Sequence, residues 1–135
     1  AWMPTALVAP STAGVALAWR LGQHLRLPVH LALVGADGRA ASLPEVLSLE
    51  GERVALVNDV VTTGDGLAAL AAVATGRGAA IAGAVWFVSR SDADVSVRVG
   101  APVASVGELV LDAWSADHCR LCSSGFALNR AIELN

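Results

Sequence analysis

The chain has 135 residues, of which 55% are hydrophobic and 16% charged, and its formal net charge at pH 7 is -3. This length and composition predict one globular domain with a packed core. All 9 basic residues are arginines, which excludes a P-loop lysine, a lysine Schiff base and a lysine general acid. The mildly acidic charge, without a basic run, gives no indication of nucleic-acid binding.

Residues 1–19 carry no charge and could be mistaken for a membrane-spanning or signal segment. Pro4 and the cluster PSTAG at residues 10–14 divide this run into two pieces that are each too short to cross a bilayer. No basic region precedes the run, as it would in a secretory signal. We therefore expect a buried strand and a buried helix here, no membrane partner and a cytoplasmic location.

Hydrophobic patterning predicts the following elements in chain order. Short apolar runs rich in β-branched residues predict strands at residues 5–9, 29–34, 53–58, 81–88, 95–99 and 103–106. Apolar residues at helical spacing predict helices at residues 14–25, with Ser11 and Thr12 as N-cap candidates, and at residues 67–75. Residues 35–51 are polar and rich in turn residues, so we expect a mobile loop with at most a strand fragment. We also expect a helical turn at Glu108.

Apolar strands that alternate with helices predict an α/β fold with a parallel, twisted sheet and helices on both faces. In such sheets, ligands bind outside the carboxyl ends of the strands. Three segments should meet at that edge, namely residues 10–12, residues 58–66 and the pair Ser89-Arg90.

The segment VALVNDVVTTGDGL, residues 54–67, carries the most chemical information. An apolar strand leads into Asn58 and Asp59, and a turn containing glycines then opens a helix. The backbone N–H groups of residues 63–66 can form a concave anion site, and the helix dipole adds about 0.3–1 kcal/mol for an anion at an exposed site. Thr62 and Thr63 add hydroxyl groups, while Asp59 can accept hydrogen bonds from sugar hydroxyls or help to hold a metal ion.

This segment resembles the phosphoribosyl-pyrophosphate signature of the type I phosphoribosyltransferases, in which four apolar residues, two acids and two apolar residues precede Thr-Thr-Gly and a small residue. The stretch LVAPSTAGVALAWRLGQHLRLPV is similar to the first strand, pyrophosphate loop and first helix of that family, and FVSR to the end of its fourth strand. The tail DAWSADHCRLCSSGFAL resembles the endings of some orotate phosphoribosyltransferase homologues. The resemblance covers most of the chain and implies a single domain, residues 1–135, without the family's upstream hood segment.

The resemblance implies transfer of ribose 5-phosphate from phosphoribosyl pyrophosphate to a nitrogenous base such as orotate, with release of pyrophosphate. Mg²⁺ would arrive with the bound phosphoribosyl pyrophosphate, no metal site of the protein's own is expected, and the protein would be a homodimer. Asn58 and Asp59 would be the catalytic pair at the ribose hydroxyls. Thr62, Thr63, Gly64, Asp65 and Gly66 would bind the 5-phosphate, Ser11, Thr12, Ala13 and Gly14 the pyrophosphate, and Arg90 the base.

Four features depart from the family pattern. Asn58 stands in place of the first acid, and Gly66 in place of a serine or threonine. Asp65 adds an anion to the phosphate loop, where repulsion at about 4 Å and an effective dielectric of 20 is roughly 4 kcal/mol per charge pair. Arg39 is the only cation in the loop at residues 35–51, where active members have a lysine. These departures leave open a second hypothesis, a non-catalytic nucleotide-sensing or dimerisation module on the same fold.

The segment at residues 64–69, GDGLAA, also matches the G-x-G-x-x-A pattern of an NADP-binding Rossmann domain, with Ser89-Arg90 about twenty residues further on. In that motif the glycines follow the strand almost directly. Whether the strand ends at Asp59 or at Gly64 would therefore distinguish the two hypotheses.

Two side-chain roles also stay open. Cys119 and Cys122 are expected to be reduced thiols in a turn of the tail, although two copies of the chain could together supply the four ligands of a zinc site. Arg90 could form an ion pair with Asp92 or Asp94 instead of binding a base.

Overall fold

The computed structural model describes residues 2–12, 14–90, 92, 94–111 and 114–126. Its centre is a 6-stranded sheet with the strand order β3-β2-β1-β4-β5-β6. The strands are β1 (Ala6–Pro10), β2 (Val29–Val34), β3 (Ala40–Ser42), β4 (Arg53–Val61), β5 (Ala80–Ser89) and β6 (Val103–Glu108). All neighbours pair in parallel except β2 and β3, which are antiparallel. The predicted sheet is therefore confirmed, with one short antiparallel strand at its edge.

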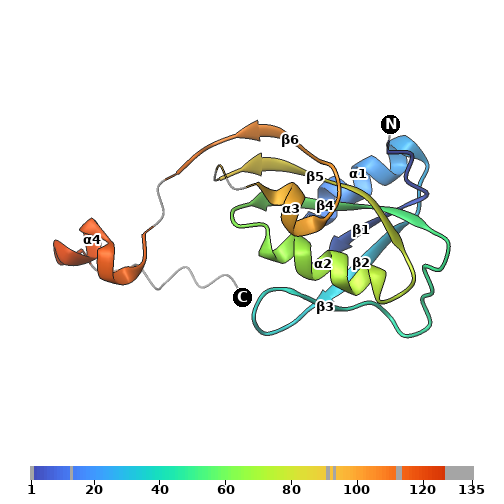
Figure 1. Ribbon diagram of the computed structural model, residues 1–135, viewed down its shortest axis with the longest axis horizontal. Coiled ribbons are helices and arrows are strands. Elements are labelled where there is room, and N and C mark those ends of the chain that lie inside the picture. The colour runs from blue at the N-terminus through green and yellow to red at the C-terminus, as the bar shows by residue number, and fades with distance from the viewer. Residues whose placement is uncertain (1, 13, 91, 93, 112–113, 127–135) are drawn as a thin grey trace.

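Helices lie on both faces of the sheet, as predicted (Figure 1). The helix α1 (Val15–Leu25) covers one face, and α2 (Asp65–Thr75) and α3 (Val95–Val99) cover the other. Two short helices follow β6, namely η1 (Ala116–His118) and α4 (Arg120–Ser123), and they lie apart from the sheet (Figure 1). Within the residues that the structure describes, none of the helices has the length and apolar character that crossing a membrane requires.

The two central strands supply both hydrophobic cores by alternating their side chains. Leu7 and Val57 pack on the α1 side, whereas Val8 and Leu56 pack on the α2 side. This is the two-residue period of a strand that is buried on both faces. Because these two strands, β1 and β4, are packed on both faces, the loops that follow their carboxyl ends start from fixed positions.

The segment Val95–Val99, predicted as a strand, is the helix α3. The side chain of Asp94 accepts hydrogen bonds from the backbone N–H and the hydroxyl of Ser96, at 3.0 and 2.6 Å. Gly100, with φ 69°, ends the helix and donates its N–H to the carbonyl of Ser96. Capping at both ends of this five-residue segment thus outweighs the strand preference of its alternating valines.

Two other local predictions are wrong. Ser11 and Thr12 do not cap α1, because the N-cap residue is Gly14 and no side chain caps this end. Glu108 does not begin a helical turn; it is the last residue of β6 and pairs with Ser89 of β5. β5 runs one residue further than predicted, so it supplies the partner that keeps this end of β6 extended.

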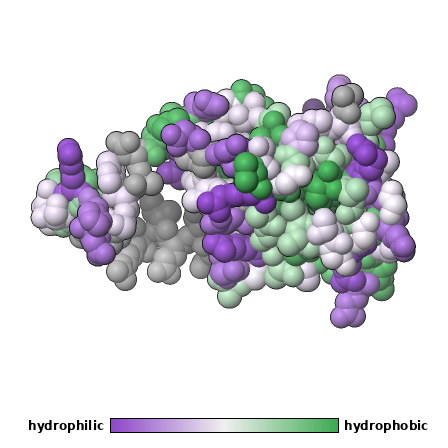
Figure 2. All heavy atoms as spheres, viewed as in Figure 1, coloured by the Kyte–Doolittle hydropathy of each residue, from purple (hydrophilic) through white to green (hydrophobic). Residues whose placement is uncertain are grey.

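The strand order defines where a ligand can bind. β1 lies beside β2 on one side and β4 on the other, and the connections that follow β1 and β4 lead to helices on opposite faces. A crevice forms outside the carboxyl ends of two such strands, which is the usual ligand position in open α/β sheets. Figure 2 shows hydrophilic residues gathered at the end of the molecule toward which β4 and β5 point.

Candidate functional site

The loop after β1 is pressed against the end of β4. Gly14 has a φ of 76°, and a Cβ atom added there would lie 2.8 Å from the Cα atom of Asn58 and 3.1 Å from the carbonyl oxygen of Val57. Such a distance is not tolerated, so only glycine allows the two segments to meet this closely. On the other side of the loop, the backbone N–H of Ser11 donates to the carbonyl of Ala32 in β2, at 2.7 Å. The loop of Ser11, Thr12 and Gly14 is therefore anchored at both ends; Ala13 lies outside the described residues.

The turn between β4 and α2 encloses a small cavity of about 130 Å³, lined by Asn58, Val60, Val61, Thr62, Thr63, Gly64, Gly66 and Leu67. Gly64, with φ 84°, is the N-cap residue of α2. The hydroxyl oxygen of Thr63 accepts the N–H of Asp65 at 3.4 Å. The first N–H groups of a helix have no partner within the helix, and Gly66 and Leu67 in the first turn of α2 line the cavity, so the positive end of the helix dipole lies beside it.

The side chains of Asn58 and Asp59 lie on opposite faces of β4. Asn58 lines the small cavity at the turn between β4 and α2, whereas Asp59 lines a separate cleft on the α1 side. Each side-chain oxygen accepts the N–H of the following residue, at 3.0 Å for Asn58 and 2.6 Å for Asp59. The strand continues through both residues to Val61, so strand alternation separates them.

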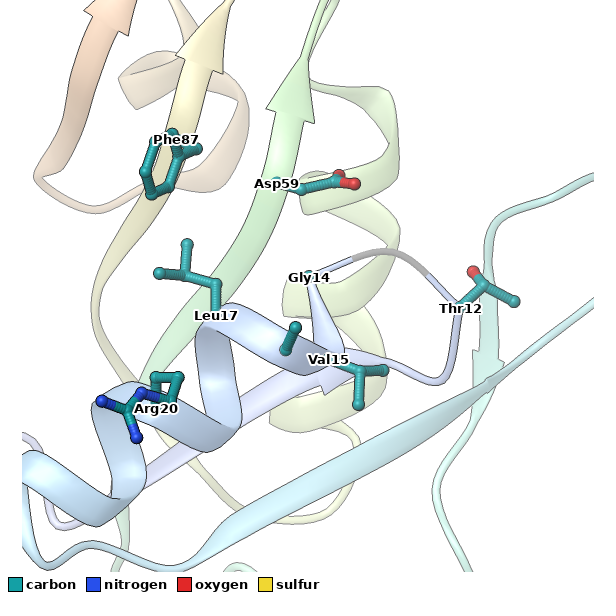
Figure 3. Close-up of a pocket in the computed structure, with 8 residues that line it drawn as sticks. Thr12, Gly14, Val15, Leu17, Arg20, Asp59 and Phe87 are labelled. Carbon is teal, nitrogen blue, oxygen red and sulfur yellow. The ribbon is translucent and has the colours of Figure 1, made fainter.

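The cleft on the α1 side is larger, about 540 Å³, and mostly apolar. Figure 3 shows the residues around it: Leu17 and Arg20 from α1, Asp59 from β4, Phe87 from β5, and Thr12 and Gly14 from the loop after β1. Phe87 is 52% exposed, so an aromatic face is available to a planar ligand group. The sequence analysis did not select Leu17, Arg20 or Phe87, because each lies at an ordinary position in a helix or strand.

Asp65, the first residue of α2, is paired with two arginines. Its Oδ1 atom lies 2.6 Å from Nη1 of Arg98 in α3, and its Oδ2 atom lies 3.6 Å from Nη2 of Arg39 in the connection between β2 and β3. The sequence analysis assigned no role to Arg98, because the alternating valines of residues 95–99 predict a strand rather than a helix. The signal that could have found it is the capping pattern, Asp94 before and Gly100 after a five-residue segment.

Arg90 follows β5 directly and has an exposed side chain. Its N–H donates to the carbonyl of Val61 at 2.8 Å, which places it beside the end of β4. In the described part of the chain, no ion pair joins Arg90 to Asp92 or Asp94. The structure thus brings Arg90 to the same sheet edge as the two loops.

A protein-bound metal centre is not formed by the residues described, among which no three His, Cys, Asp or Glu side chains gather at a possible metal position. Asp59 is an exposed carboxylate beside the loop after β1. One carboxylate together with ligand phosphate oxygens is a donor set that Mg²⁺ accepts. The site therefore fits a metal that arrives with a phosphorylated ligand.

The similarity to known proteins agrees with this geometry. The chain is 26% identical over 123 residues to the orotate phosphoribosyltransferase of Caldanaerobacter subterraneus subsp. tengcongensis, covering 90% of this chain and 63% of that one. It is 29% identical over 130 residues to that of a Thermoanaerobacter species, covering 90% of this chain and 63% of that one. The chain thus spans about 63% of the length of these curated relatives. No family model matches the chain.

Solved structures decide the fold. The orotate phosphoribosyltransferase from Aeropyrum pernix matches with a TM-score of 0.66 and 24% identity, over 80% of this chain and 62% of that one. The adenine phosphoribosyltransferase from Thermoanaerobacter pseudethanolicus matches with a TM-score of 0.67 and 17% identity, over 78% and 70%. The chain has the type I phosphoribosyltransferase fold. These matches confirm the resemblance to the type I phosphoribosyltransferases that the sequence motifs indicate.

The strand end does not favour the Rossmann hypothesis in the form in which it was stated. The strand β4 ends at Val61, between the two positions that would have distinguished the hypotheses. Three residues, 62–64, then lead into α2, and Gly66 lies inside that helix. Gly64 is thus the N-cap residue of α2, separated from the strand by Thr62 and Thr63, whereas the glycines of the Rossmann motif follow the strand almost directly.

Proposed function

We propose that this chain binds phosphoribosyl pyrophosphate and transfers its ribose 5-phosphate to a nitrogenous base such as orotate, with release of pyrophosphate. The observation that carries the proposal is the close contact between Gly14 and Asn58, which joins the loop after β1 to the end of β4. Two potential anion-binding loops and a carboxylate thus lie at one sheet edge. The similarity to orotate phosphoribosyltransferases supports orotate as the first base to test.

Each group of residues has a separate task in this proposal. The turn Thr62–Gly66 binds the 5-phosphate, the loop Ser11–Gly14 faces the pyrophosphate, and Arg90 contacts the base. Asp59 and Asn58, which line different cavities, approach the ribose hydroxyls from opposite faces of β4. Asp59 would also help to hold Mg²⁺ that arrives with the substrate, and this ion would supply positive charge beside the phosphate groups. The active form of the protein in this proposal is a homodimer in the cytoplasm.

The chemistry needs no nucleophilic side chain. The bond between C1 of the ribose and the pyrophosphate oxygen breaks with its electron pair on the oxygen, and C1 bonds to a nitrogen of the base, whose proton passes to the released pyrophosphate or to water. The transition state therefore carries positive charge on the sugar and negative charge on the leaving group. Asp59 offsets the charge on the sugar, while the backbone donors of the two loops hold the phosphate groups in place.

A second candidate function is nucleotide sensing or dimerisation without catalysis. Asn58 has no charge with which to attract Mg²⁺, and its amide oxygen accepts a hydrogen bond from its own neighbour, Asp59. The chain also has no lysine with which to close over a pyrophosphate. These features would leave ligand binding in place while removing turnover.

Isothermal titration calorimetry with phosphoribosyl pyrophosphate, with and without Mg²⁺, tests the proposal. We expect binding that Mg²⁺ strengthens, and a weakening of at least about tenfold, or 1.4 kcal/mol, in Asp59→Asn. Asp117→Asn is the matched control, because Asp117 is an exposed carboxylate in η1, outside the proposed site.

Turnover is measured separately as pyrophosphate release with orotate, uracil or adenine as the base. Binding with turnover supports the enzyme, and binding without turnover for any base supports the sensing function. The absence of detectable binding to the wild-type chain in either condition would contradict both and favour a dimerisation module.

A further inference from the structure

Asp65 creates an electrostatic problem for the proposed function. It is the first residue of α2 and lies between Gly64 and Gly66, which both line the cavity of the turn that would bind the 5-phosphate, although Asp65 itself does not line that cavity. A carboxylate about 4 Å from a phosphate would oppose it by roughly 4 kcal/mol per charge pair at an effective dielectric of 20. This repulsion exceeds the contribution of about 0.3–1 kcal/mol that a helix dipole makes at an exposed site.

The two carboxylate oxygens face two different arginines. Nη1 of Arg98 lies 2.6 Å from Oδ1, and Nη2 of Arg39 lies 3.6 Å from Oδ2. The formal charge of this group of three side chains is +1, from two guanidinium groups and one carboxylate. The Asp65 side chain is 36% exposed and that of Arg98 52%, so these pairs add little to stability, but they orient the carboxylate.

The side chain of Arg98, which pairs with Asp65, packs against the turn between β4 and α2. A Cβ atom added at Gly64 would lie 3.0 Å from Cγ1 of Val95 and 3.3 Å from Cδ of Arg98. The stem of Arg98 thus packs on the backbone of the turn, and α3 is fixed there by Val95, which is buried. Arg39 faces the other carboxylate oxygen of Asp65, over a longer distance.

We propose that Arg98 is a positioning residue of the phosphate-binding turn: it pairs with Asp65, draws the carboxylate toward α3 and leaves the turn able to accept a phosphate. This inference rests on the proposed function, since it concerns the same turn. It assigns to Arg98 an electrostatic task that acts through Asp65 and requires no contact with the ligand.

A double-mutant cycle tests this assignment. Ribose 5-phosphate and phosphoribosyl pyrophosphate are titrated into the wild type, Arg98→Gln, Asp65→Asn and the double variant, each first shown to be folded by thermal unfolding. We expect Arg98→Gln to weaken binding of both probes by about tenfold, equal to 1.4 kcal/mol, because the carboxylate is released. Asp65→Asn should restore binding in the Arg98→Gln background to within about threefold of the wild type.

Arg26→Gln is the control for the loss of one positive charge, because Arg26 follows the carboxyl end of α1, at the opposite edge of the sheet, and is exposed. It should leave both affinities unchanged. Unchanged binding in Arg98→Gln, or a loss that Asp65→Asn does not restore, would overturn the assignment. If the wild type binds neither probe but Asp65→Asn binds, the assignment fails while the turn's phosphate chemistry stands; if neither binds, the proposed function fails as well.

Discussion

Gly14 is pressed against the backbone of β4, and its φ of 76° lies in the left-handed region that favours glycine. Two separate costs therefore oppose any larger residue there, the backbone conformation and the collision with Asn58. Gly38 has the same φ of 76° but nothing within 4 Å of an added Cβ. The pair of glycines thus allows the two costs to be measured separately.

We expect Gly38→Ala to lower the free energy of unfolding by about 1–2 kcal/mol, the cost of left-handed backbone for an ordinary residue. Gly14→Ala should lower the free energy of unfolding by about 1–3 kcal/mol more than Gly38→Ala does, because the added methyl group must displace the backbone of β4. Urea unfolding of both variants measures the difference. Equal losses in the two variants would contradict the close approach of Gly14 to Asn58.

At the scale of elements, α3 depends on the residues at its ends. Hydrogen bonds from the side chain and the backbone N–H of Ser96 hold the pKa of Asp94 below its usual range. A carboxyl group with a depressed pKa in the folded state stabilises that state at neutral pH. The stabilisation is lost as the pH falls through the depressed value.

We therefore expect Asp94→Ala to lower the Tm at about pH 7, and its effect to shrink once the pH falls below the ordinary Asp pKa of about 3.9 and on through the depressed pKa of the folded state. Asp94→Asn, whose amide oxygen can still accept from Ser96, should keep part of the stability at neutral and at acidic pH. Thermal unfolding followed by circular dichroism across this pH range checks both variants. A Tm difference for Asp94→Ala that does not depend on pH would show that the carboxylate charge does not contribute.

Cys119, the N-cap residue of the short helix α4, and Cys122 within that helix form a pair of titrating thiols. Hydrogen bonds from the backbone and side chain of Cys122 lower the pKa of the Cys119 thiol. The same side-chain hydrogen bond, together with burial and the charge on Cys119, raises the pKa of Cys122. Cys119 therefore carries the larger thiolate fraction at neutral pH.

Because the thiolate is the reactive form, iodoacetamide should alkylate Cys119 faster than Cys122 near neutral pH. As the pH is raised, the alkylation rate of Cys119 should begin to increase at a lower pH than that of Cys122. Cys122→Ala should slow the reaction of Cys119, since the side-chain donor is lost. Mass spectrometry of peptides from a timed reaction measures both rates. Equal rates at the two thiols would contradict this hydrogen-bond arrangement.

At the scale of the whole molecule, the two hydrophobic cores share the strands β1 and β4. Leu7 belongs to the core on the α1 side and Leu56 to the core on the α2 side. Neither core can lose its packing without exposing one face of a strand that the other core needs. The domain should therefore unfold in a single cooperative step.

We expect Leu7→Ala and Leu56→Ala each to lower the free energy of unfolding by about 2–5 kcal/mol, without splitting the transition. Leu33→Ala, at an exposed position in β2, should cost less than about 1 kcal/mol. Urea unfolding followed by circular dichroism and by tryptophan fluorescence measures the free energy of unfolding and shows whether there is one transition or two. Two separated transitions in either core variant would show that the cores unfold independently.

The overall fold could be predicted because buried parallel strands leave long apolar runs, and Val29–Val34 was predicted with both its bounds. The site was predictable only in part. The sequence analysis ended β4 at Asn58, so it could not place Asn58 and Asp59 on opposite faces. The contact between Asp65 and Arg98 joins residues 33 apart through a helix that alternates like a strand. Such a contact depends on tertiary packing, which local patterning does not contain.

The contact between Gly14 and Asn58 also has a consequence for selectivity by ligand length. Since the loop after β1 cannot slide along β4, the gap between the two anion-binding segments is built into the backbone and does not adjust to the ligand. A molecule that engages both segments must carry its two anionic groups at one separation. Ribose 5-phosphate, with its single anionic group, and ligands with a shorter spacer could engage only one of the two segments and would bind more weakly than phosphoribosyl pyrophosphate, whatever the base.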